Sequence, residues 1–366
     1  MKITGYRTQA VRMPRESGGP AGAAVANFVT LRLHTDAGFE GISYAGFFST
    51  LMTAATKSAL DAMCEQISGA DPLMVEAITQ RLLALAGGGT PGGRVVGSPA
   101  GTVTYCVSAI DVALWDIKAK AAGVPLYKLL GGYRDRVPVY ASGHLWRDYD
   151  LKMLAGTGPK LVEQGYRAMK FRLGAEKTAA AELDRVRVLR EAVGPDIDLM
   201  IDINQGWSVD QAIGIGRHLA DYGIYWLEDP TQHEDYPGLA RIAAALDTPI
   251  AAGEYHFGIP PFRHMLEQRS IDIVMADLMR AGGISGFMKA GHLAEAFNLP
   301  IVTHLAPEIL IHPLAALSNG LTAEWMPWST GMFKELPKLE HGELLLPDRP
   351  GLGLEFDEEA LVRFAA

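Results

Sequence analysis

The feature that most constrains the fold of this chain is a repeat that begins at Val137. A short β-rich run is followed by a segment of helical periodicity, and the pair recurs about every 20–31 residues. The β-rich runs lie at 137–144, 168–174, 198–204, 224–230, 249–254, 271–277, 300–304 and 321–324. Eight parallel strands that alternate with helices predict a (β/α) barrel of the TIM type, whose active site lies at the C-terminal ends of the strands.

Ionisable side chains stand at or near the ends of seven consecutive runs. They are Lys170 with Arg172, Asp202, Glu228, Glu254, Asp277, His304 and Glu324. Any one of them alone would be read as a solvated loop residue or a helix cap. A barrel, however, brings all these ends to one mouth, where unpaired charges would repel one another. We therefore expect a compensating group in the mouth.

Three of these acids stand on adjacent strands. Asp202, Glu228 and Glu254 would form an all-oxygen site of the kind that suits a hard cation. The pattern predicts that these three residues bind Mg²⁺.

The stretch "RAMKFRLG" places two cations on a single strand. Lys170 and Arg172 are two residues apart, so their side chains share one face. They could stabilise an anionic substrate, or they could neutralise Asp202 and Glu228 without touching a substrate. Both interpretations remain open on the sequence alone.

The first third of the chain has a different pattern. Alternating residues before position 50 predict a hairpin of half-buried strands that turns at 36–38, and helical spacing follows over 51–130. This combination is typical of an α+β unit. The glycine-rich stretch 16–24 lacks the context of a phosphate loop, and it is either a mobile lid or an ordinary disordered loop.

Composition excludes several function classes. A net charge of −9 argues against a nucleic-acid partner, and no apolar run approaches the roughly 18 residues of a membrane span. The two cysteines, Cys64 and Cys106, are too few for a disulfide framework and are expected to be buried apolar residues. We expect a cytoplasmic homo-oligomer that acts on a small molecule.

Several motifs together resemble the mandelate racemase subgroup of the enolase superfamily along essentially the whole chain. They are "AIDVALWDIKAKAAGVPLYKLLGG", "DINQGW", "WLEDP", "AGE", "DLMRAGGISG" and "THLAPE". The resemblance implies a modified TIM-type (β/α) barrel at 129–329 and an α+β capping domain at 1–128, to which a tail at 330–366 returns.

The resemblance also implies roles for the strand-end residues. Asp202, Glu228 and Glu254 would bind Mg²⁺, His304 paired with Asp277 would be a general base or acid, and Glu324 would hydrogen-bond the intermediate. The substrate would be a hydroxy-carboxylate that loses its α-proton through an enediolate, a chemistry for which enolase-superfamily sites use a Lys or His base with Mg²⁺. Other candidates for the pocket lining are Tyr44, His144, Trp146 and His256, each of which could equally be core or rim.

Arg172 departs from the pattern of many relatives, which read Lys-x-Lys and use the second lysine as a base. A guanidinium stays protonated and accepts protons poorly. A single competent base, His304, favours β-elimination of water from a sugar acid, the reaction of an acid-sugar dehydratase. The alternatives are a racemase, epimerase or cycloisomerase, with Lys170 as second base after burial lowers its pKa, and, in a different class, a metal-bound barrel that binds acids without turnover.

Overall fold

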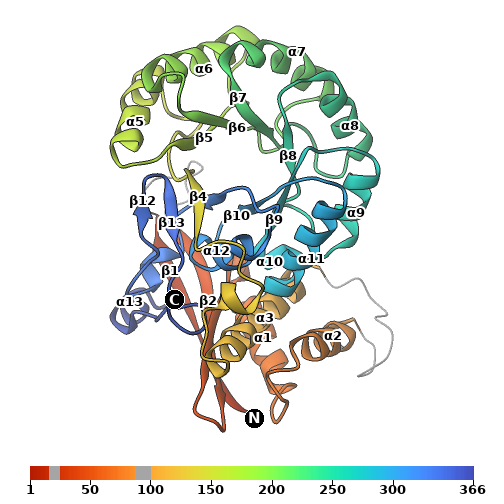
Figure 1. Ribbon diagram of the computed structural model, residues 1–366, viewed down its shortest axis with the longest axis vertical. Helices are drawn as coiled ribbons and strands as arrows, with labels where there is room; N and C mark the ends of the chain where they lie inside the picture. The colour runs from red at the N-terminus through yellow and green to blue at the C-terminus, as the bar shows by residue number, and fades with distance from the viewer. Residues whose placement is uncertain (16–24, 88–99) are drawn as a thin grey trace.

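The computed structural model describes residues 1–15, 25–87 and 100–366. The stretch 16–24, considered above as a lid, lies outside these residues. Figure 1 shows a ring of helices around a curved sheet, with the N-terminal third of the chain packed below it.

The expected barrel is present. Its strands are β4 (Arg136–Ala141), β5 (Ala168–Arg172), β6 (Asp198–Asp202), β7 (Ile224–Glu228), β8 (Ile250–Ala252), β9 (Ile273–Asp277), β10 (Ile301–His304) and β11 (Ala323–Trp325). Strands β4 to β10 pair in parallel in chain order, and β11 pairs in parallel with β4. The amide of Leu321 donates to the carbonyl of Ile301 at 2.8 Å, which links β10 to the segment before β11 and closes the ring.

Helices separate the strands, as the periodicity predicts. They are α5 (Leu151–Glu163), α6 (Ala179–Val193), α7 (Val209–Leu219) with the 3-10 turn η2 (Ala220–Tyr222), α8 (Tyr236–Ala245), α9 (Pro260–Glu267), α10 (Leu278–Ala281), α11 (Gly283–Ala296) and α12 (Pro307–Ala316). Figure 1 shows α5 to α9 on the outside of the strands.

The alternation of side chains along each strand positions the site. Inward-facing residues fill the barrel interior with a buried cluster that includes Met200, Trp226, Met275 and Val302. Each of these lies two residues before an ionisable residue of the strand end, so the next inward-facing position on each strand carries an ionisable group. The apolar layer therefore forms the floor beneath the candidate site.

The N-terminal unit contains a three-stranded antiparallel sheet where the sequence predicts a hairpin. The strands are β1 (Ile3–Pro14), β2 (Val25–Thr35) and β3 (Glu40–Phe48), in the order β1-β2-β3. The predicted turn at 36–38 connects β2 to β3. These two strands are mostly buried, and not half-buried as predicted, because both faces of the sheet are covered. Val29 and Leu31 pack with helix residues such as Leu60, whereas Phe28 joins the large core shared with the barrel and the tail.

The helical part of this unit follows β3. Its elements are η1 (Thr50–Met52), α1 (Thr53–Glu65), α2 (Val75–Ala86), α3 (Thr102–Ala121) and α4 (Leu126–Leu129). Helix α3 contacts the barrel directly, since Ser108 Oγ donates to the carbonyl of Met279 at 2.8 Å and Trp115 Nε1 donates to Ser285 Oγ at 2.9 Å. Both cysteines are buried and free, as predicted.

The tail after the barrel runs back to the N-terminal sheet. Its elements are η3 (Thr330–Met332), β12 (Leu339–Glu340), β13 (Glu343–Leu345) and α13 (Glu358–Arg363). Strand β13 pairs antiparallel with β4, and the amide of Arg12 on β1 donates to the carbonyl of Phe364 at 2.8 Å. The C-terminus accordingly lies beside β1 in Figure 1. Across the described ranges, no helix combines the length and the apolar character needed to span a bilayer.

Candidate active site at the strand ends

All eight residues predicted for the site lie at the carboxyl ends of the barrel strands, Glu254 two residues beyond the end of β8 and the others within their strands. Strand register aligns several of them: Arg172 is level with Asp202, Asp202 with Glu228, and Asp277 with His304. Seven of the residues are at most 4% exposed, and the side chain of His304 is 12% exposed. The charges are therefore held away from bulk water, where their mutual interactions are strong.

Lys170 is surrounded by acids. Its Nζ lies 2.5 Å from Glu228 Oε1, 3.0 Å from Glu324 Oε1 and 3.7 Å from Asp202 Oδ2. Burial lowers the pKa of this ammonium, but the three carboxylates outweigh burial and hold the pKa well above its usual range. Burial therefore acts on Lys170 as predicted, but the net lowering of its pKa that the sequence suggests is not found, because these neighbouring carboxylates act in the opposite direction.

Arg172 faces a loop as much as it faces the acids. Its guanidinium donates to the carbonyls of Ser142 at 3.0 Å and His144 at 3.3 Å, and to Ser142 Oγ at 3.2 Å. Its Nε lies 3.6 Å from Asp202 Oδ2, and its Cζ lies 3.8 Å from the ring centroid of Trp146. The two cations of β5 therefore share Asp202 but otherwise have different partners.

His304 and Asp277 form the predicted pair. His304 Nδ1 lies 2.8 Å from Asp277 Oδ2, and the other ring nitrogen, Nε2, lies 3.2 Å from Glu254 Oε2. Burial lowers the pKa of the imidazole, but Glu254, Asp277 and Glu324 together raise it to about 9. The position of Asp277 is fixed because its Oδ1 also caps α10, accepting the amides of Met279 and Arg280 at 2.8 Å.

Glu324 is held as an ionised acceptor. Its Oε1 accepts from Ser142 Oγ at 2.7 Å and its Oε2 from the amide of Leu305 at 2.7 Å. Burial raises the pKa of this carboxyl, but Lys170 and His304, together with these hydrogen bonds, lower it to about 2. An ionised carboxylate accepts hydrogen bonds and does not donate them.

Comparison with known proteins identifies the family. Residues 11–131 match the N-terminal domain of the mandelate racemase / muconate lactonizing enzyme family, and residues 156–360 match the enolase C-terminal domain-like family. The L-talarate/galactarate dehydratase of Salmonella typhimurium is 32% identical over 323 residues, which cover 88% of this chain and 79% of that protein. The chain belongs to the mandelate racemase subgroup of the enolase superfamily.

A second relative and a solved structure align with this chain over nearly their whole length. The 3,6-anhydro-alpha-L-galactonate cycloisomerase of Streptomyces coelicolor is 32% identical over 343 residues, 92% of this chain and 91% of that protein. The solved L-talarate/galactarate dehydratase of Salmonella typhimurium LT2, liganded with Mg and L-lyxarohydroxamate, superposes with a TM-score of 0.92 at 29% identity, covering 100% of this chain and 93% of that one. The predicted fold class is thereby confirmed.

Asp229 is a further candidate site residue, which the sequence patterns do not single out. Within the described residues, Glu228, Asp229 and Glu254 bring carboxylate oxygens within 4.8 Å of one another, while Asp202 lies beside the two cations of β5. The sequence signal for it is the second acid of "WLEDP", which directly follows the predicted ligand Glu228.

The burial and the unpaired oxygens of Asp229 indicate that this site can bind a cation. The residue is 0% exposed, its backbone has a φ of 41°, and neither carboxylate oxygen has a hydrogen-bond partner among the described residues. Burial, together with Glu254, Glu228 and Asp202, raises its pKa well above the usual range. Buried, unpaired oxygen donors of this kind fit a hard divalent cation.

The other candidate lining residues have mixed environments. Tyr44 is buried, and its hydroxyl donates to Glu308 Oε1 at 2.6 Å, so it braces the N-terminal sheet against α12. His256 is also buried, with a pKa that burial lowers to about 4. His144 is partly buried, and its carbonyl accepts from Arg172.

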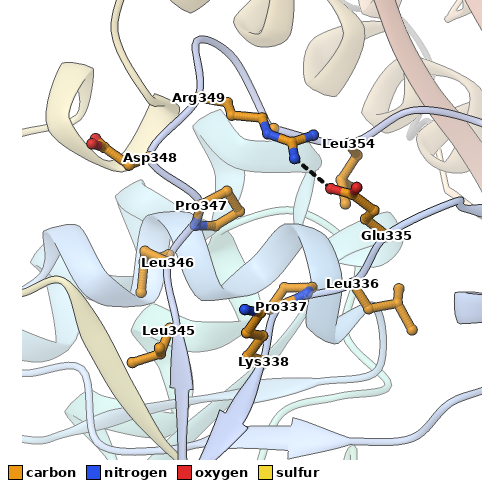
Figure 2. Close-up of a pocket in the computed structure, with 11 residues that line it drawn as sticks. Glu335, Leu336, Pro337, Lys338, Leu345, Leu346, Pro347, Asp348, Arg349 and Leu354 are labelled. Carbon is orange, nitrogen blue, oxygen red and sulfur yellow. Dashed lines mark hydrogen bonds and ion pairs between the residues drawn. The ribbon is translucent and has the colours of Figure 1, made fainter.

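A hollow of about 280 Å³ lies elsewhere, in the C-terminal tail. Figure 2 shows its lining residues, which include Glu335 paired with Arg349, and all of them come from positions 335–354. None of the predicted site residues lines this hollow.

Proposed function

We propose that this protein is a Mg²⁺-dependent acid-sugar dehydratase, which removes the α-proton of a hydroxy-carboxylate and expels the β-hydroxyl as water. The observation that carries the proposal is the asymmetry of the ionisable groups. The His304–Asp277 pair offers an acid–base group, while Arg172, where many relatives have a lysine base, is a guanidinium bound to a loop. A site that transfers protons on only one face of the substrate suits elimination, whereas racemisation needs an acid–base group on each face.

The acids at the ends of β6 to β8 would hold the cation. Asp202, Glu228 and Glu254 are the ligands we propose, with Asp229 beside them. A divalent cation bound there would stabilise the negative charge that develops on the substrate carboxylate as the α-proton leaves. Lys170 contributes a fixed positive charge next to the same acids, and this charge costs no reorganisation during the reaction.

His304 would carry out both proton transfers. Its Nδ1 is paired with Asp277, and its Nε2 lies 3.2 Å from Glu254 Oε2. Binding of the cation by Glu254 would weaken the interaction that raises the pKa of His304 most, and would leave Nε2 for the substrate. In the first step Nε2 takes the α-proton, and the C–H electron pair is delocalised into the carboxylate as an enediolate. In the second step the electron pair returns, the β-carbon–oxygen bond breaks, and His304 gives its proton to the departing hydroxyl. Water and an enol that tautomerises to a 2-keto acid are the products.

The names of the relatives agree with this proposal at the level of substrate class. Proteins named as dehydratases of talarate/galactarate, arabinonate and D-xylonate match this chain at 30–34% identity. A cycloisomerase matches it equally well at 32%, so isomerisation of an anhydro or lactone form of a sugar acid is the second candidate function. A racemase or epimerase needs a competent acid–base group on each face, and the ion pairs of Lys170 with Glu228, Glu324 and Asp202 disfavour it as the second base.

The decisive experiment screens aldonic and aldaric acids with Mg²⁺ and identifies the product by mass. Loss of one water with formation of a 2-keto acid supports the dehydratase, whereas a product of unchanged mass supports the cycloisomerase or a racemase. A chain that binds these acids but neither converts them nor exchanges their α-proton for deuterium would be the non-catalytic acid-binding barrel.

A further inference from the structure

Four side chains form a continuous stack that reaches from the candidate site to the N-terminal sheet. The Cζ of Arg172 lies 3.8 Å from the ring centroid of Trp146. Trp146 and Trp328 are stacked with centroids 6.1 Å apart and planes within 6°. The Cζ of Arg15 lies 3.8 Å from the ring centroid of Trp328 on the other end. Each of the two parallel indole rings therefore has a guanidinium group over one of its faces.

The members of this stack come from four separate parts of the chain. Arg172 ends β5, Trp146 lies in the loop between β4 and α5, Trp328 lies between β11 and η3, and Arg15 directly follows β1. Each cation–indole contact is attractive because the negative face of the ring meets a positive charge. The stack thus connects the N-terminal sheet to the strand that carries Lys170.

Ring faces, and not hydrogen bonds, hold the outer half of the stack. Within the described ranges, Arg15 Nε and Trp328 Nε1 are buried without a hydrogen-bond partner. Phe47 of β3 packs against Trp328 with centroids 6.5 Å apart. The contact between Arg15 and Trp328 therefore depends on the packing of the guanidinium against the ring, and replacing either residue should break it.

The inner half of the stack explains why position 172 suits an arginine. A planar guanidinium can stack on Trp146 while its edge donates to the carbonyl and hydroxyl of Ser142. A lysine ammonium has no plane to stack and cannot make this set of contacts. The surroundings of Arg172 are thus shaped for a fixed cation and not for a proton carrier.

We propose that Trp146 and Trp328 are positioning residues for Arg172, and that Arg15 completes the stack, so that the end of β1 controls where the charge of Arg172 lies relative to Asp202. This inference deepens the proposed function and rests on it for its effect on turnover. The geometry of the stack itself can be tested without turnover.

The first experiment measures the stack by circular dichroism. Two parallel, stacked indoles give a coupled pair of bands of opposite sign, which Trp328→Phe should abolish. Trp207→Phe is the matched control: it removes another of the six tryptophans, one buried beside Gly174 and outside the stack, and it should leave the coupled bands in place. Loss of the bands in Trp207→Phe, or their persistence in Trp328→Phe, would contradict the stack.

The second experiment is a double-mutant cycle between the two ends, Arg15→Ala and Arg172→Lys, with Arg15→Lys as the conservative variant. Arg15→Ala should lower kcat for the sugar acid by about 3- to 10-fold, in keeping with the loss of one partly buried cation–π contact, and should change KM little. Arg15→Lys should recover most of that loss, because an ammonium can still sit over Trp328. In the Arg172→Lys background the further effect of Arg15→Ala should vanish.

Two results would overturn the proposal: an Arg15→Ala variant with unchanged kcat, or effects of Arg15 and Arg172 that simply multiply. The coupled circular dichroism bands distinguish a failure of the stack from a failure of the proposed function. If no sugar acid is turned over but Trp328→Phe still abolishes the bands, the stack stands and the proposed function fails. If turnover is found and Trp328→Phe leaves the bands in place, the stack is wrong and the proposed function stands.

Discussion

Asp111 links α3 to α11 and predicts a pH dependence of stability. The residue is 0% exposed; its Oδ1 accepts the amide of Ser285 at 3.0 Å, and its Oδ2 accepts Ser285 Oγ at 2.5 Å. Burial raises the pKa of this carboxyl to about 7 and outweighs the two hydrogen bonds, which lower it. The position at the first turn of α11 also favours an anion, but that effect is at most about 2 kcal/mol.

The direction of the effect follows from proton binding. Between the usual carboxyl pKa of about 4 and the folded-state value of about 7, the folded protein keeps this proton and the unfolded chain releases it. The free energy of unfolding therefore falls as the pH rises through this window and levels off above it. About three pKa units at 1.36 kcal/mol each give a loss of about 4 kcal/mol.

Asp111→Asn should remove this dependence. The asparagine Oδ1 can still accept the amide of Ser285 and its NH₂ can donate to Ser285 Oγ, so the variant should match the natural protein near pH 4.5. At pH 8 it should be more stable, by up to about 4 kcal/mol, because no buried carboxylate has to ionise. Urea unfolding followed by circular dichroism at both pH values gives the comparison.

Asp36→Asn is the control, since Asp36 is an exposed carboxylate in the turn between β2 and β3. Its difference from the natural protein should not change between the two pH values. Parallel curves for Asp111→Asn and the natural protein would refute the reasoning. A variant that is less stable only at pH 8 would show that the α11 amides stabilise the carboxylate more than burial destabilises it.

Three further predictions concern the site. Chelation should abolish turnover and Mg²⁺ should restore it, with Asp202→Asn binding Mg²⁺ far more weakly by calorimetry; full activity in excess chelator would remove the basis of the mechanism. His304→Asn should keep its thermal midpoint within a few degrees but lose turnover by about 10²-fold or more, and Asp277→Asn should lose less; near-normal dehydration by His304→Asn would require another base. In D₂O only one epimer of a substrate analogue lacking the β-hydroxyl should be labelled, and Arg172→Lys should add slow exchange on the opposite face; labelling of both epimers by the natural protein would favour a racemase.

The sequence predicts the barrel well because its signals are local. Each β-rich run of the repeat is a strand, and the ionisable residues at the run ends reach one mouth because parallel strands all point the same way. The hairpin prediction was incomplete because strand alternation reports burial on one face. Here α1 and α3 cover one face of the sheet, and the barrel and tail cover the other.

The partners of each charge could not be predicted, because they depend on loops and side-chain rotamers. Burial alone predicts a lowered pKa for Lys170, yet three acids from β6, β7 and β11 converge on it. Asp229 escaped notice because it follows a strand end by one residue, where period-two reasoning turns a side chain outward. Its φ of 41° departs from strand geometry, and its carboxylate lies beside those of Glu228 and Glu254.

The two cations of "KFR" therefore answer different needs. Lys170 is enclosed by carboxylates and offsets their charge. The planar guanidinium of Arg172 instead donates a hydrogen bond to the carbonyl of Ser142 and stacks on the ring of Trp146. An arginine held in this way keeps its positive charge near Asp202 but cannot accept a proton. Under the proposed function, only the His304 side of the substrate would exchange protons, and a carbanion formed on that side would either recapture its proton there or lose a leaving group. A single histidine can assist loss of the β-hydroxyl, because it can give its proton to the departing oxygen.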